Sequence, residues 1–310
     1  MSTEGRPAPS RILLRVRAQL QFLRSSIAGP WSLLAPTVVF FVIAFLIPIG
    51  LMISFSVYRQ SASGALEPGM TLANYTRLFS VDLYRKAMLT TLRVSVLTTI
   101  FCAILAYPLA MLMARGSDFV RRSLTIIVIA PMLINVVVRS YVWRIILANG
   151  DAGILNWSLG QLGLGQMRII YTEWAIIIGS VHFFLSTMVL PLAAAIARID
   201  PSVEEAARTL GATAAQVFRR VTLPLSVPGL AAGSALVFSL TASSFVLPAL
   251  LGGNFAKMLG PLIQEQILSV FDWPFGAALA TALIATVLIA NFISIGLVER
   301  RYRAKAKGAA

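Results

Sequence analysis

The residues with the most informative types and spacing lie in one polar segment, Asp200–Pro224, set between two long apolar runs. Asp200 can cap a helix whose first turn contains Pro201, where a missing N–H costs little. Gly211 can end that helix in the left-handed conformation. The chemistry this helix offers is noncovalent recognition by an apolar stripe at i, i+3, i+4, i+7 spacing, made of Val203, Ala206, Ala207 and Leu210.

A second short helix is expected directly after Gly211. Thr213 and Gln216 have the spacing of a capping box. Pro224 is expected to end this helix, because proline has no N–H to donate. A second apolar stripe is formed by Ala214, Val217, Phe218 and Val221. The segment therefore predicts a compact helical hairpin with a narrow apolar face that needs a partner.

This hairpin resembles the cytoplasmic EAA loop of permease subunits of binding-protein-dependent ABC importers. The family pattern is Glu-Ala-Ala, three residues, Gly, nine residues, an aliphatic residue, any residue and Leu-Pro. It is met here by Glu205, Ala206, Ala207, Gly211, Val221, Leu223 and Pro224, with valine where isoleucine is commoner. The resemblance implies that these residues form the element that couples the chain to a cytoplasmic ATPase. An ordinary amphipathic loop helix is the alternative.

The composition is that of a membrane protein rather than of a soluble domain. Of the 310 residues, 58% are hydrophobic, and the mean hydropathy is +0.83. The formal charge of +14 does not indicate nucleic-acid binding, since the Arg and Lys residues sit mainly beside the apolar runs. We expect no cleavable signal, and the Arg-rich N-terminal segment has the helical spacing of an amphipathic helix on the inner membrane surface.

Six apolar runs are each long enough to cross a hydrocarbon core of about 30 Å. Backbone groups in lipid must be satisfied internally, so the fold class predicted is an all-α membrane protein with six transmembrane helices. The spans are Leu33–Val57, Val94–Ala114, Leu124–Leu147, Trp174–Ala197, Val227–Leu251 and Trp273–Val298. Prolines expected to kink them are Pro36, Pro48, Pro108, Pro131 and Pro191. A further short helix is expected in the outer segment MLGPLIQEQILSV, residues 258–270.

The distribution of basic residues predicts the orientation of these spans. With both termini in the cytoplasm, 17 of the 26 Lys and Arg residues lie on the inner side and 7 on the outer side. This places the hairpin in the cytoplasm. The domains expected are a cytoplasmic amphipathic segment over residues 1–30, a permease domain over 31–300 with the EAA-like loop at 198–226, and a basic cytoplasmic tail over 301–310.

Signatures of catalysis and metal binding are missing. The sequence has no G-x-x-x-x-G-K-[ST] phosphate loop, so ATP would have to be hydrolysed by another chain. Cys102 is the only cysteine and His182 the only histidine, which leaves no cysteine cluster or histidine pair for a metal. No acidic residue lies in a predicted span to relay protons or cations, which disfavours an ion-coupled carrier or channel. We therefore expect a non-catalytic subunit without a cofactor or metal.

Four polar residues in the spans are candidates for a translocation path or gate: Arg139, Asn135, His182 and Ser243. Arg139 lies deep in the third span, roughly 22 Å across when counted from Leu124 at the inner face. It either pairs with helix carbonyls or an acidic partner residue, or contacts the passing solute. His182 either joins helices or contacts solute. Ser243 either lines a path or bonds back to its own helix.

Close helix contact is expected at Gly229 and Gly233, a G-x-x-x-G step at the start of the fifth span. The step serves either packing within this chain or an interface between subunits.

The wider sequence resembles the spermidine/putrescine-type branch of these permeases, over roughly residues 31–300. The resemblance is carried by RSYVWRIIL from Arg139, NGDAGILN from Asn149, LPLSVPGLAAG from Leu223 and VLPALLGG from Val246. Ser186 stands where the branch often has proline. The resemblance implies the MetI-like fold of type I ABC importers. It also implies two cytoplasmic ATPase subunits, a second permease subunit that is a paralogue, and a periplasmic solute-binding protein. An opine, an amino-acid-like compound or an oxyanion is the alternative solute.

Overall fold

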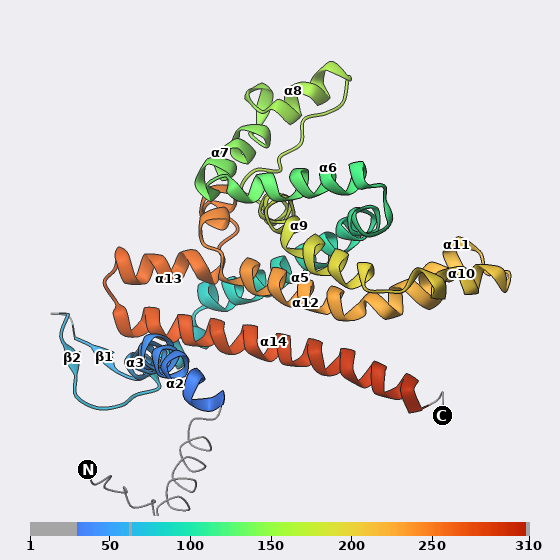
Figure 1. The fold of residues 1–310 in the computed structure, drawn as a ribbon. Helices are drawn as coiled ribbons and strands as arrows, with labels where there is room; N and C mark the ends of the chain where they lie inside the picture. The colour runs from blue at the N-terminus through green and yellow to red at the C-terminus, as the bar shows by residue number, and fades with distance from the viewer. Residues whose placement is uncertain (1–29, 62–63, 308–310) are drawn as a thin grey trace, which may run out of the picture. The chain divides into compact units, whose positions relative to one another are not determined.

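The computed structural model describes residues 30–61 and 64–307, and helices dominate it (Figure 1). The strands among these residues are β1 (Arg59–Gln60) and β2 (Leu66–Glu67), which pair antiparallel. The chain divides into two compact units, Met1–Ser54 and Phe55–Ala310. The amphipathic helix predicted near the N-terminus lies outside the described residues.

The first unit contains most of the first predicted span. Its elements are α2 (Pro30–Phe41), the π-helical turn η1 (Val42–Leu46) and α3 (Ile47–Ser56), whose last two residues belong to the second unit. Together they give an apolar run, Leu34–Ser56, that is long enough to cross a membrane.

The second unit is built from long helices joined by short ones. In chain order they are α4 (Ala73–Ser80), α5 (Asp82–Arg115), α6 (Asp118–Ile129), η2 (Ala130–Leu133), α7 (Val136–Ile146), η3 (Gly150–Ala152), α8 (Ile154–Gln161), α9 (Glu173–Ala197), α10 (Pro201–Thr209), α11 (Ala214–Val217), η4 (Phe218–Thr222), α12 (Leu223–Ser243), η5 (Pro248–Gly252), α13 (Leu259–Leu268) and α14 (Trp273–Lys307). Within the described part of the chain, five helices could cross a membrane, and a bent pair makes a sixth if it counts as one span.

That bent pair is the third predicted span, and the kink predicted at Pro131 is present as a sharp break. The arm Asp118–Leu133 meets Val136–Ile146 at an angle of 98°. Pro131 lies just before the break, and the Asn135 side chain caps the new helix by accepting from the Val137 N–H at 2.8 Å. The depth estimated for Arg139 along a straight helix therefore does not hold, because the path of the chain turns before reaching it.

The fifth predicted span is also broken, since α12 ends at Ser243 rather than at Leu251. Two nonhelical residues follow before the chain coils again into η5, and the short helix predicted at residues 258–270 is confirmed as α13. Gly260 lies against the break, because a Cβ there would stand 2.4 Å from the Ser244 carbonyl oxygen.

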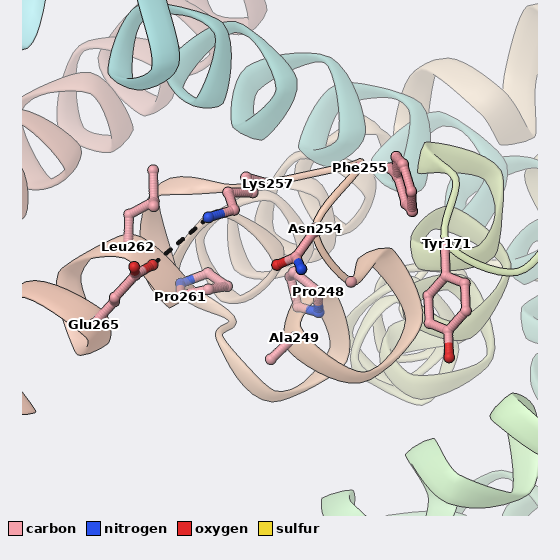
Figure 2. A pocket seen from close by; sticks show the side chains of 10 residues that line it. Tyr171, Pro248, Ala249, Asn254, Phe255, Lys257, Pro261, Leu262 and Glu265 are labelled. Carbon is pink, nitrogen blue, oxygen red and sulfur yellow. Dashed lines mark ion pairs between the residues drawn. The ribbon is translucent and has the colours of Figure 1, made fainter. Parts of the chain in front are cut away.

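A pocket of about 400 Å³ opens between η5 and α13, with Lys257 and Glu265 in its lining (Figure 2).

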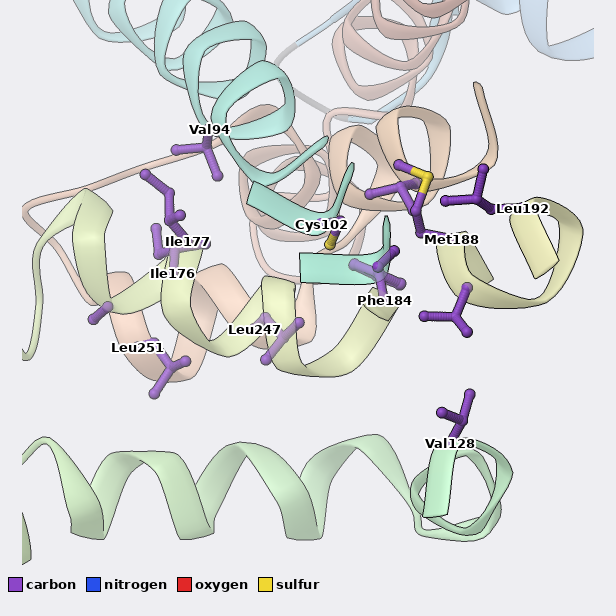
Figure 3. Packing of buried hydrophobic residues seen from close by; sticks show 14 of the residues in the cluster. Val94, Cys102, Val128, Ile176, Ile177, Phe184, Met188, Leu192, Leu247 and Leu251 are labelled. Atoms are coloured by element: carbon purple, nitrogen blue, oxygen red, sulfur yellow. The ribbon is translucent and has the colours of Figure 1, made fainter. Parts of the chain in front are cut away.

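The main core lies where α5, α9 and α12 pack together (Figure 3). Fully buried side chains include Cys102, Ile176, Met188, Leu192 and Leu251. Cys102 behaves as a small apolar residue here, as its place in an apolar run suggests.

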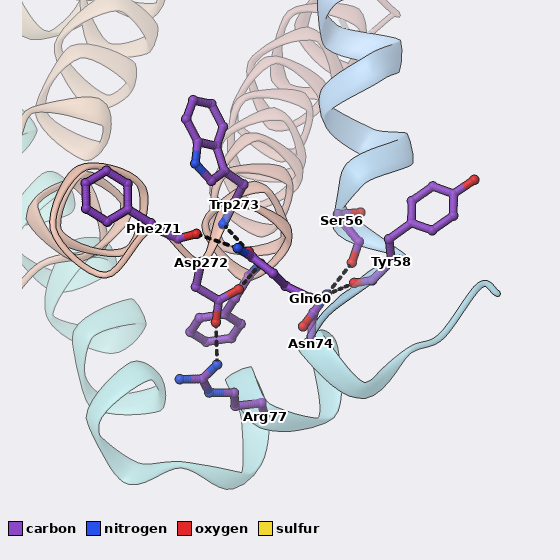
Figure 4. Close-up of polar contacts among 9 residues, drawn as sticks. Ser56, Tyr58, Gln60, Asn74, Arg77, Phe271, Asp272 and Trp273 are labelled. Atoms are coloured by element: carbon purple, nitrogen blue, oxygen red, sulfur yellow. Dashed lines mark hydrogen bonds and ion pairs between the residues drawn. The ribbon is translucent and has the colours of Figure 1, made fainter. Parts of the chain in front are cut away.

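A second cluster holds the start of α14 beside α4 (Figure 4). Asp272 accepts a hydrogen bond from Arg77 at 2.9 Å, and Gln60 bridges the Phe271 carbonyl and the Trp273 N–H. Asn74 donates to the Ser56 and Tyr58 carbonyls. These bonds fix the β1–β2 turn against the first residues of α14.

The G-x-x-x-G step serves packing within the chain. Gly229 and Gly233 are buried, and both face α9. A Cβ at Gly229 would stand 2.3 Å from the Ala195 Cβ and 2.7 Å from the Pro191 carbonyl oxygen. Since neither of these atoms belongs to a flexible side chain, the two helices could accommodate a methyl group only by moving apart.

We predict that Gly229→Ala lowers the stability of the chain by about 1–3 kcal/mol through overpacking. The measurement is thermal unfolding of the detergent-solubilised protein. Gly160→Ala is the matched control, because a Cβ at Gly160 would meet nothing within 4 Å. Loss of subunit assembly with unchanged unfolding of the single chain would contradict this role for Gly229.

Candidate functional site

The predicted helical hairpin is present, formed by α10 and α11. Asp200 Oδ1 accepts from the Ser202 N–H at 2.9 Å, and this bond holds the pKa of the Asp200 carboxyl below its usual value. Gly211 has φ +87°, as its predicted left-handed role requires. Thr213 and Gln216 form the predicted capping box. The local sequence thus sets both helix starts and the joint between them.

Pro224 does not end the second helix, so that prediction is wrong. The chain passes from α11 through the π-helical turn η4 directly into α12, and Pro224 lies in the first turn of α12. The Leu223 N–H bonds to the Phe218 carbonyl, five residues back. The wider turn accommodates a proline that would clash with the carbonyl four residues before it in a regular helix.

One face of the hairpin is uncovered by the described residues. Val203 is 45% exposed and Leu210 89% exposed. Glu205 and Ala206 are also exposed, whereas Ala207 is half-buried. The apolar stripe predicted for α10 is therefore free to contact another molecule.

Sequence reasoning missed Glu204, which lies about 100° round α10 from Val203 and is buried. Its Oε1 accepts from the Thr222 hydroxyl at 2.9 Å and pairs with Arg115 at 3.4 Å. Arg115 also donates to the Ile199 carbonyl at 2.8 Å. The one sequence signal for this role is that two glutamates, Glu204 and Glu205, precede Ala206, and a single one satisfies the EAA pattern.

The path candidates Arg139 and His182 lie together. Arg139 is 5% exposed and donates to the Pro131 carbonyl at 2.9 Å and the His182 carbonyl at 3.2 Å. Its guanidinium carbon lies 4.1 Å from the centre of the Phe183 ring. Of the alternatives left open by the sequence, pairing with helix carbonyls is the arrangement observed.

The His182 ring completes this cluster. Its Nδ1 accepts from the Trp143 indole N–H at 3.1 Å and lies 3.3 Å from an Arg139 nitrogen. Two donors facing Nδ1 require a neutral ring with its proton on Nε2. His182 therefore joins α7 to α9 through its acceptor nitrogen.

Asn135 and Ser243 form hydrogen bonds within their own segments rather than with Arg139 or His182. Asn135 caps α7, and the Ser243 hydroxyl donates to the Ser239 carbonyl at 2.8 Å, within its own helix. Each residue lies beside a break, at the start of α7 and at the end of α12 respectively. Within the described ranges, no three His, Cys, Asp or Glu residues gather as a metal site would require.

Comparison with known proteins agrees with this architecture. Residues 106–304 match the family model described as binding-protein-dependent transport system inner membrane component. The spermidine/putrescine transport system permease protein PotB of Haemophilus influenzae is 38% identical over 83% of this chain and 88% of its own. PotB of Escherichia coli is 39% identical over 69% of this chain and 77% of its own.

Solved structures show the same fold at lower identity. A crystal structure of a bacterial ABC transporter involved in the import of the acidic polysaccharide alginate aligns with TM-score 0.71 and 22% identity, covering 92% of this chain and 99% of that one. The fold is thus that of an ABC importer permease with the MetI-like arrangement. The chain belongs to the family of binding-protein-dependent transport system inner membrane components, as a multi-pass, non-catalytic permease subunit.

We predict that Arg139→Gln lowers the melting temperature of the solubilised protein without impairing membrane insertion. The change leaves buried carbonyls at Pro131 and His182 without their donor, at about 1–3 kcal/mol for each group. Arg139→Lys should recover part of the loss, because an ammonium lacks the planar fork of donors. The control is Arg144→Gln, since Arg144 is exposed and bonds the Tyr171 hydroxyl. Equal melting of Arg139→Gln and the unchanged protein would refute the bracing role.

Proposed function

We propose that this chain is the permease subunit of an ATP-driven importer for polyamines such as spermidine and putrescine. The observation that carries this proposal is the 38% identity to a spermidine/putrescine permease over 83% of the chain. The complex would comprise two ATPase subunits, a periplasmic solute-binding protein and a second permease subunit that is a paralogue. A molybdenum transport permease is 28% identical over 69% of the chain, so an oxyanion is the second candidate solute.

The solute is tested by uptake in cells that lack their own polyamine importers. Cells expressing the complete complex should accumulate labelled spermidine, and unlabelled putrescine should compete while molybdate should not. If molybdate competes and putrescine does not, the solute is an oxyanion and the polyamine proposal is wrong.

The hairpin is the proposed contact with the ATPase, through Glu205, Ala206, Ala207, Gly211, Val221, Leu223 and Pro224. Its exposed apolar stripe supports this, because Leu210 and Val203 are large apolar side chains without cover in the described chain. The continuous helix from α11 through η4 into α12 supports it as well. A displacement of the hairpin would act directly on a membrane-spanning helix.

Arg139, Asn135, His182 and Ser243 are proposed to shape the translocation path. Asn135 and Ser243 lie beside helix breaks, and broken helices are common where a path or solute site is formed. Arg139 and His182 are bonded to the protein itself, which supports a role in holding the path's shape rather than in binding the solute.

We predict that Gly211→Val uncouples ATP hydrolysis from uptake. The left-handed conformation at φ +87° costs about 1–2 kcal/mol for a residue with a Cβ, and more for a β-branched one. Glu205→Lys should act in the same direction by placing a cation in the N-terminal half of α10. Solute uptake and ATPase activity are measured in proteoliposomes. The control is Gly165→Val in the loop before α9, where a Cβ meets nothing and φ is not positive; wild-type uptake by both hairpin variants would remove the coupling assignment.

Both termini and the hairpin are proposed to lie in the cytoplasm. We predict that, in cells expressing this chain without its ATPase, a membrane-impermeant thiol reagent reaches Leu162→Cys in intact cells and reaches Leu210→Cys only after the membrane is opened. Both leucines are well exposed, and the native Cys102 is fully buried, so the background should be low. Labelling of Leu210→Cys in sealed cells would reverse the orientation.

A further inference from the structure

The root of the hairpin contains a buried polar junction that the coupling motif does not include. Glu204 lies outside the exposed stripe of α10, about 100° round the helix from Val203, and is 8% exposed. One oxygen, Oε1, receives both the Thr222 hydroxyl and the Arg115 guanidinium. Arg115 is the last residue of α5, and Thr222 is the last residue of η4. Three separate parts of the chain therefore meet at one carboxylate.

The π-helical turn η4 is held at both of its ends. Thr222 bonds Glu204 at one end, and Phe218 at the other packs edge-on against the Tyr107 ring at 5.1 Å. Tyr107 also shares a hydrogen bond with Ser226 in the first turns of α12. Tyr107 and Arg115 lie two turns apart on α5, about 12 Å along its axis. The last turns of α5 thus contact Phe218 of η4 directly and reach Thr222 only through Glu204.

This arrangement gives α10 two roles on two faces. The exposed face offers Val203 and Leu210 to a partner, while Glu204 on the other face ties α10 to α5 and to η4. The joint at Gly211 alone would let α10 swing without moving α12. The Glu204 contacts remove that freedom, because they link α10 to Thr222 across the hairpin. π-Turns often occur at functional sites, and this one lies between the hairpin and a membrane-spanning helix.

We propose that Glu204 is a positioning residue that transmits displacement of the hairpin to α5 and α12 through Arg115 and Thr222. This inference rests on the proposed function of the hairpin as the ATPase contact. Glu204 itself does not face the ATPase. Its removal should therefore leave docking intact and weaken the link between ATP hydrolysis and solute movement.

The test is Glu204→Gln in the complete transporter complex, reconstituted in proteoliposomes with its binding protein and spermidine. Glutamine keeps the size of the side chain but loses the charge that pairs with Arg115. The ratio of spermidine imported to ATP hydrolysed should fall about tenfold, the scale of one lost charge-assisted hydrogen bond. Co-purification with the ATPase should stay close to that of the unchanged complex, and ATP hydrolysis should continue while spermidine import falls.

Asp118→Asn is the matched control, because Asp118 is an exposed carboxylate whose ion pair with Arg121 lies within α6. Its ratio should equal that of the unchanged complex. Thr222→Val provides a second, nearly isosteric variant should Glu204→Gln fail to fold, and its ratio should fall in the same direction. The double variant should lower the ratio by less than the product of the two single reductions, since both changes act on contacts of the same Glu204 carboxylate.

Three results would overturn the inference. A normal ratio in Glu204→Gln and Thr222→Val would show that the junction transmits nothing. Parallel loss of uptake, hydrolysis and melting temperature in both would show that it only stabilises the fold. If the unchanged chain co-purifies with no ATPase, the proposed function fails and this inference fails with it. If the unchanged complex couples ATP hydrolysis to uptake and Glu204→Gln has the same ratio of spermidine imported to ATP hydrolysed, the inference about Glu204 fails while the proposed function stands.

Discussion

The need of every backbone polar group for a partner inside an apolar medium governs this structure. A continuous helix meets that need by itself, and a break does not. At the break after η2, the protein supplies replacements from side chains: Asn135 receives the Val137 N–H, and Arg139 donates to the Pro131 carbonyl. The bend of 98° exists because these two side chains take over the bonding that the helix gives up.

The same constraint explains why polar residues are found between the long helices. The Ser186 hydroxyl donates to the Val128 carbonyl and so joins α9 to α6. His182 accepts from Trp143 and joins α9 to α7. Both bonds link the bent third segment to the central helix α9. Buried polar side chains here connect elements, and the apolar core around Met188 and Leu192 supplies the bulk of the packing.

The hairpin differs from the spans because one of its sides is exposed and another is buried against the rest of the chain. Local capping by Asp200 and Thr213 forms its helices, and a left-handed Gly211 turns the chain between them. The outward face of α10 stays apolar and uncovered, while Glu204 is buried between Arg115 and Thr222. The π-turn η4 then carries the helix past Pro224 into α12, so the hairpin is continuous with a membrane-spanning helix.

The sequence by itself determined the features that depend on near neighbours: apolar runs of spanning length, the helix caps at Asp200 and Thr213, the positive φ of Gly211 and the short helix α13. Composition and periodicity suffice for these, since the interacting groups lie within a few residues of one another. Only the tertiary structure decided where helices break and which polar side chain faces inward. Pro131 bends its segment sharply, whereas Pro108 and Pro191 lie within unbroken α5 and α9. Glu204 and Glu205 are adjacent and alike in type, yet the distant Arg115 and Thr222 select one of them for burial, which no local pattern encodes.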